Sequence, residues 1–221
     1  MRLSRRTVLW LAAGAVLLCP APASARIIEI GLTEQPATPS CPSNPCLAVS
    51  RTTGYQAKVV DSRAVYRVPA DGKIVAWSIG LGRPTEEQVR FFESSFGESS
   101  ARITILRPGN RLAARVISQS PIRQLEQYFG QSVQFPLQRA LNVKKGYIVA
   151  LTVPTWAPAL TQLLDDGSSW RASRPRDGCD DTSAQTAQMV LKRIARYRCL
   201  YKARLVYTAT LITHPEPEPP N

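Results

Sequence analysis

The sequence contains a single histidine, His214, which lies near the C-terminal end. A serine hydrolase needs a histidine as the base beside its nucleophile, and a cysteine hydrolase needs a free thiol as well. Zinc sites combine cysteine and histidine at short, regular spacings, which this chain lacks. We therefore expect no metal, no cofactor and no hydrolase of these two classes.

The signatures of other enzymes are also missing. Residues 80–85, GLGRPT, lack the lysine and the spacing of a phosphate-binding loop. A glycosidase needs two carboxylates that flank the scissile bond, whereas neighbouring acids in polar turns are ordinarily solvated. The candidates here are such turn acids: Asp165, Asp166, Asp180 and Asp181. We expect a protein without enzymatic activity.

The first 25 residues have the three parts of a signal peptide. Arg2, Arg5 and Arg6 are followed by an apolar stretch at 7–18 and by a small-residue cleavage site at 23–25. About a dozen apolar residues is fewer than the roughly 20 that span a bilayer. We expect cleavage after residue 25, no transmembrane segment afterwards, and a secreted or cell-wall-associated protein.

The route of export stays open. Residues 4–9, SRRTVL, resemble a twin-arginine signal, but adjacent arginines also occur in ordinary signals. Cys19 follows Leu18, where a lipoprotein signal needs a small residue, so we expect no lipid anchor.

The chain is strongly basic. Its formal net charge of +12 falls to +9 when Arg2, Arg5 and Arg6 are removed with the leader, which contains no acid. Such a charge favours acidic partners such as nucleic acid, anionic cell-wall polymers or anionic lipid surfaces. The alternative is that the charge serves solubility alone.

Four cysteines remain after the leader, namely Cys41, Cys46, Cys179 and Cys199. An even number in an exported protein indicates disulfides, and four cysteines allow three connectivities. The local pairing of Cys41 with Cys46 and of Cys179 with Cys199 is the simplest, because each loop closes without demanding a particular topology.

Residue patterns predict a mainly β chain. Tyr147, Val149, Leu151 and Val153 fall on one face of an extended segment that we expect to end at Pro154. Alternation at 74–80 predicts a strand with Trp77 in the core, and residues 108–110, PGN, predict a hairpin turn. The last predicted strand covers 201–212.

Two segments have helical spacing. Residues 82–100 carry Val89, Phe92 and Phe96 on one helical face. A second helix is predicted from a cap at Thr182 or Ser183 up to residue 197. Short helical insertions among many strands predict a two-sheet antiparallel sandwich that is jelly-roll-like. We expect an irregular arm at 26–46, the sandwich at 47–213 and a proline-rich tail at 214–221.

Three motifs carry a resemblance to known proteins: GKIVAW at 72–77, ITILRPG at 103–109 and VKKGYIVAL at 143–151. With these motifs the chain resembles a group of secreted bacterial β-sandwich proteins for which no function is established. The resemblance covers residues 46–212 and implies a fold and export, but no activity.

The most exposed chemistry is expected after Pro154. Trp156 and Trp170 are predicted in or beside loops, with Arg171, Arg174 and Arg176 nearby, so rings and guanidinium groups could bind sugars and anions. The alternative is that both tryptophans cover an end of the sandwich. A further basic run is either an anion site or a solvated face: Lys192, Arg193, Arg196, Arg198, Lys202 and Arg204.

Two functions follow from these patterns. The first is a non-catalytic binding module for a carbohydrate or an anionic cell-wall polymer, which requires exposed Trp156 and Trp170. The second is a structural protein, or one that contacts another surface protein, with those tryptophans buried. No specific nucleic-acid motif occurs.

Overall fold

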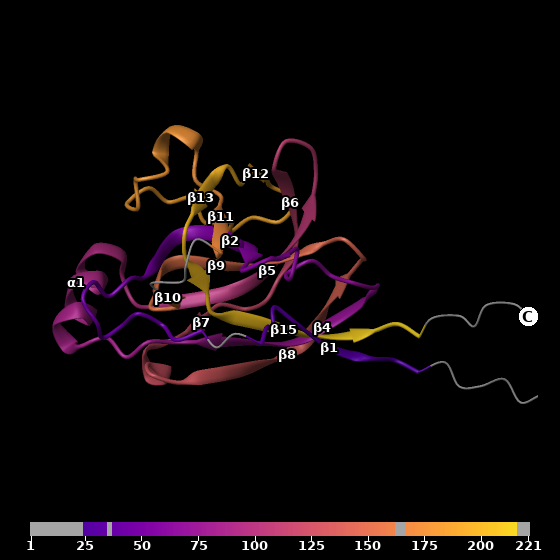
Figure 1. Cartoon of the computed structure of the whole chain (residues 1–221), viewed down its shortest axis with the longest axis horizontal. Helices are drawn as coiled ribbons and strands as arrows, with labels where there is room; N and C mark the ends of the chain where they lie inside the picture. The colour runs from indigo at the N-terminus through magenta and orange to yellow at the C-terminus, as the bar shows by residue number, and fades with distance from the viewer. Residues whose placement is uncertain (1–23, 35–36, 162–166, 216–221) are drawn as a thin grey trace, which may run out of the picture.

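The computed structural model of the chain describes residues 24–34, 37–161 and 167–215 (Figure 1). Most of the expected leader, the end of the expected tail, and Asp165 and Asp166 lie outside these ranges. The elements described are β1 (Ile27–Ile30), β2 (Val49–Val59), β3 (Ser62–Arg63), β4 (Gly72–Gly80), α1 (Glu86–Phe96), β5 (Ser100–Pro108), β6 (Ala113–Gln119), β7 (Arg123–Gln124), η1 (Glu126–Tyr128), β8 (Ser132–Val143), β9 (Ile148–Ala157), β10 (Leu160–Thr161), β11 (Ser169–Ala172), η2 (Arg176–Gly178), β12 (Ile194–Arg196), β13 (Cys199–Tyr201), β14 (Arg204–Leu205) and β15 (Tyr207–Thr213).

Antiparallel pairing joins the described strands into three sheets. One has the order β1-β15-β4-β8, and a small one pairs β10 with β14. A nine-stranded sheet has the main order β12-β6-β5-β9-β2-β11-β13 and curls into a half-barrel. Figure 1 shows it above the four-stranded sheet. The predicted mainly β, antiparallel class is confirmed, but the strands form three sheets where two were expected.

The hydrophobic core lies between the four-stranded sheet and the inner face of the nine-stranded sheet. Trp77 of β4 is fully buried there, with its ring centroid 4.9 Å from that of Phe135 in β8. From the other sheet, β9 contributes Val149, Leu151 and Val153. Both the predicted core position of Trp77 and the predicted apolar face of this strand are confirmed.

The strand β9 continues through Pro154 to Ala157, so its expected end at Pro154 is wrong. Its register with β2 shifts between Ser50 and Thr52, so Pro154 and Thr155 form a bulge opposite Arg51, and the ladder needs no donor from Pro154 there. At the bulge Arg51 adopts a φ of 44°. Its carbonyl accepts hydrogen bonds from the Thr186 N–H and hydroxyl, both at 2.9 Å.

The expected helix within residues 82–100 is confirmed as α1. The Thr85 hydroxyl accepts a hydrogen bond from the Gln88 N–H at 3.3 Å, and the Gln88 side chain accepts one from the Thr85 N–H at 2.9 Å. This reciprocal pair caps the helix. Over the ranges described, no helix has the length and apolar character needed to cross a membrane.

The second predicted helix does not form. Residues 173–198, here called the excursion, contain the short 3-10 helix η2 and the edge strand β12, and otherwise run over the outer face of the nine-stranded sheet in extended and bent conformations (Figure 1). The Lys192 N–H donates to the Val116 carbonyl at 2.9 Å, and β12 pairs with β6. In a helix these N–H groups would bond within the segment. Here they bond to the sheet, so the helical spacing of the apolar residues does not produce a helix.

A closed ring of hydrogen bonds attaches the excursion to the sheet. The hydroxyls of Thr53, Thr152 and Thr104 form a row across β2, β9 and β5, with oxygen–oxygen distances of 2.8 and 2.6 Å. Gln119 of β6 donates from Nε2 to the Thr104 hydroxyl at 2.9 Å and to the Gln188 carbonyl at 2.6 Å. The Gln188 N–H donates to the Thr53 hydroxyl at 2.9 Å, which closes the ring. We call these five residues the threonine ring.

Both predicted disulfides are confirmed. Cys41 pairs with Cys46, and Cys179 pairs with Cys199. The second bond joins the segment after η2 to β13, so it holds the two ends of the excursion together.

The last predicted strand, 201–212, is divided in the structure. β13 pairs with β11 in the nine-stranded sheet, β14 pairs with β10, and β15 pairs with β4 and β1 in the four-stranded sheet. The chain changes sheets here, which a continuous strand would not allow.

Replacing Thr152 with Val should lower the free energy of unfolding by about 1–3 kcal/mol, because the buried hydroxyls of Thr53 and Thr104 then each lose a partner. Urea unfolding followed by circular dichroism measures this. The exposed Thr182→Val is the matched control and should change stability by less than about 0.5 kcal/mol. Equal effects of the two substitutions would show that the ring does not contribute.

Candidate functional site

A groove of about 690 Å³ opens between the two ends of the excursion. We call it the arginine groove, after Arg174, Arg176, Arg193, Arg196 and Arg198, which line it. One acidic side chain, Asp177, accompanies these five arginines. The groove is held open by the Cys179–Cys199 disulfide at one end and by the β12–β6 pairing at the other.

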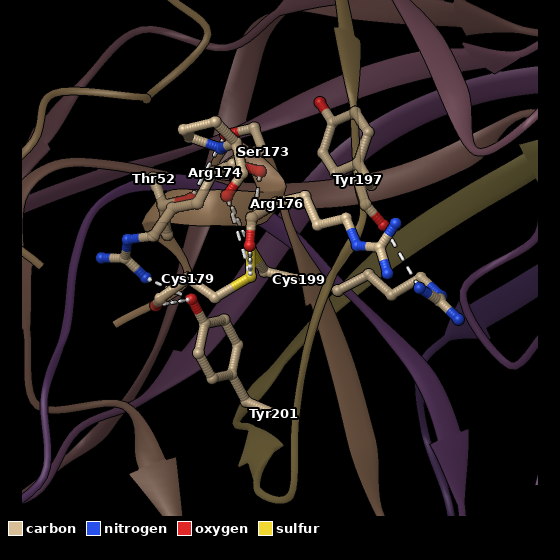
Figure 2. Close-up of a disulfide and its surroundings, with 10 residues drawn as sticks. Thr52, Ser173, Arg174, Arg176, Cys179, Tyr197, Cys199 and Tyr201 are labelled. Carbon is tan, nitrogen blue, oxygen red and sulfur yellow. Dashed lines mark hydrogen bonds between the residues drawn. A yellow bond between two sulfur atoms is a disulfide. The ribbon is translucent and has the colours of Figure 1, made fainter. Parts of the chain in front are cut away.

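Arg174 is the buried member of the set, with 3% of its surface exposed. Its Nη2 donates to the Ser50 carbonyl at 2.7 Å, and its Nη1 donates to the Tyr201 hydroxyl at 3.3 Å. Tyr201 in turn donates to the Cys179 carbonyl, so Arg174 is tied to the disulfide (Figure 2). Its Nε is buried and has no partner among the described residues.

The other four arginines are exposed and carry their charge at the groove surface. Across residues 24–34, 37–161 and 167–215, the one ion pair joins Arg90 to Glu86 at 3.6 Å. No carboxylate in those ranges therefore forms an ion pair with the groove arginines. Clustered guanidinium groups that outnumber the nearby carboxylates attract anions.

Gln188 supplies a polar acceptor to the same groove. Its side chain is buried, with 6% of the residue exposed, and its Nε2 donates to the Thr186 carbonyl at 2.6 Å. Its Oε1 is buried and accepts no hydrogen bond from the described residues. A buried acceptor without a partner is costly, so a bound hydroxyl or N–H at this place would be stabilising.

Asp181 belongs to a turn. Its Oδ1 accepts hydrogen bonds from the N–H and hydroxyl of Ser183 and from the N–H of Ala184. Mainly through the Ser183 hydroxyl, these bonds lower the pKa of the Asp181 carboxyl. The group is therefore ionised at neutral pH, as expected for a solvated turn acid.

The two tryptophans predicted for the site lie near the ends of strands and are buried, so the exposure that the binding module required is not found. Trp156 lies in β9 with 0% exposure, and its ring is 4.7 Å from that of Phe92 in α1. Trp170 lies in β11 with 3% exposure, 4.7 Å from the ring of Tyr201. Neither ring offers a face to a ligand, because α1 packs on Trp156 and β13 packs on Trp170.

The predicted arginines divide between two places. Arg174 and Arg176 meet in the arginine groove, whereas Arg171 points to a different pocket of the outer sheet face. Arg193, Arg196 and Arg198 come from the basic run, which the sequence left open between an anion site and a solvated face. Gln188 was not predicted, because its place between a polar stretch and Met189-Val190-Leu191 gave no signal of a specific contact.

Comparison with protein-family models, with curated proteins and with solved structures finds no match to this chain. In the part of the chain that the structure describes, no three His, Cys, Asp or Glu side chains come together as a metal site would require. The chemistry of the groove is therefore the basis for a function.

In the purified protein without residues 1–25, acrylamide should quench little of the tryptophan fluorescence, because Trp77, Trp156 and Trp170 are all buried. Trp156→Phe and Trp170→Phe should each lower the total emission and leave the accessible fraction unchanged. Strong quenching that disappears with either replacement would show an exposed ring and contradict the packing described above.

Proposed function

We propose that this protein is an exported, non-catalytic binding module for an anionic cell-wall polymer, which it binds in the arginine groove. In this proposal it belongs with the secreted bacterial β-sandwich proteins that its motifs resemble. Its fold is then a variant of the jelly-roll sandwich, in which the curled sheet is the scaffold of the groove.

The observation that carries the proposal is the composition of the groove: five arginines, one aspartate and no ion pair to them within the described ranges. Like charges repel one another, so such a cluster lowers the stability of the folded protein unless an anion binds. Arg174 is 3% exposed and its guanidinium is fixed by two hydrogen bonds, so it adds a positive charge behind the four exposed arginines without a further loss of side-chain entropy on binding.

The chemistry of the lining favours a polymer that has both anionic groups and hydroxyls. Guanidinium groups bind phosphate and carboxylate through paired hydrogen bonds. Gln188 also lines the groove, and its buried Oε1 has no hydrogen-bond partner among the described residues, so a polymer hydroxyl that reaches this atom would donate a hydrogen bond to it. A neutral glycan would match Gln188 and leave the arginines unused, so we favour the anionic polymer over a neutral carbohydrate.

A second candidate is a structural or protein-interaction role at the cell surface. The burial of both tryptophans favours it, since the first function was expected to need them exposed. The excursion also exposes four apolar side chains to between 38% and 58%: Met189, Val190, Leu191 and Ile194. An apolar patch of this kind can contact a protein partner. Salt separates the two roles, because it weakens polyanion binding far more than apolar contact.

Replacing Arg193 and Arg196 together with Ala should weaken binding of polygalacturonate and of inorganic polyphosphate roughly tenfold to a hundredfold, since charge-assisted hydrogen bonds are removed. Isothermal titration calorimetry at low salt measures the affinity, with neutral dextran as the ligand expected not to bind.

The matched control is Lys73→Ala with Arg139→Ala, which removes the same charge from exposed positions on the four-stranded sheet. This control should bind within about threefold of the wild type, because exposed charges beyond a Debye length are largely screened. An equal loss in both variants would show that net charge alone acts. Failure of the wild type to bind either polyanion would overturn the proposal and favour the protein-interaction role.

A further inference from the structure

We propose that a second basic pocket continues the arginine groove, and that the ligand is a linear polyanion long enough to occupy both places at once. This inference rests on the proposed function, since it extends the same binding surface. The second pocket is lined by four cations, Lys58, Arg63, Arg67 and Arg171, together with Tyr55.

The second pocket has a volume of about 290 Å³ and, like the groove, lies on the outer face of the nine-stranded sheet. No carboxylate is among its lining residues. Arg67 donates from Nη1 to the Gly146 carbonyl at 3.0 Å, and Arg171 donates from Nη1 to the Tyr197 carbonyl at 3.3 Å. These bonds position two of the guanidinium groups against the sheet.

Tyr55 adds a hydroxyl donor to the second pocket. Burial raises the pKa of Tyr55, and the charges of Arg171 and Arg67 oppose this rise. The phenol is therefore protonated at neutral pH and can donate a hydrogen bond to an anion.

Tyr197 lies between the arginine groove and the second pocket and contacts residues of both. It follows Arg196 and precedes Arg198, both of which line the arginine groove. Its ring centroid is 5.4 Å from that of Tyr55, and its carbonyl accepts the bond from Arg171. Residues of the second pocket thus touch the segment that carries the groove arginines. An anion chain that leaves the groove at Arg198 meets Arg171 next.

The lining favours a polymer without bases over a nucleic acid. Single strands are usually bound through exposed aromatic rings on which bases stack. The arginine groove has no aromatic lining residue, and the second pocket has Tyr55 and Tyr66. Their rings pack against Tyr197 and Tyr207, at centroid distances of 5.4 and 4.4 Å. Recognition along this surface is therefore by charge and hydrogen bonding.

The test compares tripolyphosphate with long-chain inorganic polyphosphate, at equal phosphate concentration, by calorimetry. A chain that reaches both pockets binds the second one at high effective concentration, so the wild type should bind the long chain about a hundredfold more tightly. In the double variant Arg63→Ala with Arg67→Ala this advantage should fall below about tenfold. Its affinity for tripolyphosphate in the larger arginine groove should be unchanged, and this binding also reports that the variant is folded.

The slope of log affinity against log salt for the long chain should fall in this variant by about one for each phosphate group that the second pocket no longer binds. The control, Lys73→Ala with Arg139→Ala, should retain the full advantage of the long chain. If Arg63→Ala with Arg67→Ala also retains the full advantage of the long chain, the second pocket does not bind the polymer, while the proposed function of the arginine groove still stands. Equal affinity for a single-stranded oligonucleotide of the same charge would overturn the choice of a polymer without bases. Absence of binding to either polyphosphate by the wild type would overturn both proposals.

Discussion

The threonine ring is the constraint on which the basic surface depends. Thr53, Thr104 and Thr152 are fully buried, and their hydroxyls are satisfied only when Gln119 and Gln188 close the circuit. In a low-dielectric interior such a network is stable when complete and costly when broken. Because Gln188 belongs to the excursion, the ring requires that segment to lie against the sheet. The arginine groove exists only in that arrangement.

The ring and the Cys179–Cys199 disulfide counter a repulsive charge distribution. Five arginines around one groove repel each other, and an unattached loop of this composition would separate them. Attachment at the disulfide, at the ring and along β12 prevents the separation. A bound polyanion would remove the remaining repulsion and release the counterions that otherwise surround the cations. If the proposed function holds, binding of the anion therefore also stabilises the fold.

Local patterns predicted those parts of the fold whose neighbours lie close in sequence. The helix α1, the hairpin after β5, the core position of Trp77 and both disulfides follow from spacing, turn residues or short loops. The helix predicted at 182–197 does not form, although its apolar residues repeat with helical spacing. Several of its N–H groups instead bond to β2 and β6, which come much earlier in the chain. No local pattern reports such partners.

Partners distant in sequence also explain why the candidate site was predicted only in part. Trp156 follows Pro154, which normally ends a strand, but the bulge at Arg51 lets β9 continue and buries the ring beneath α1. Arg174 and Arg176 were predicted because they stand beside a tryptophan. Arg198 joins them because the disulfide brings β13 next to η2. Composition showed the excess of cations, and only the fold shows which of them share a surface.

The most direct test of the central claim is an NMR titration with polyphosphate that follows the Nε–Hε signals of the arginine side chains. Binding in the groove predicts that the signals of Arg174, Arg193, Arg196 and Arg198 move together and saturate at the same ligand concentration. Those of Arg90 and Arg139, which lie on α1 and β8, should stay in place. Shifts of equal size at Arg139, or no shift at Arg174, would contradict a site in the arginine groove.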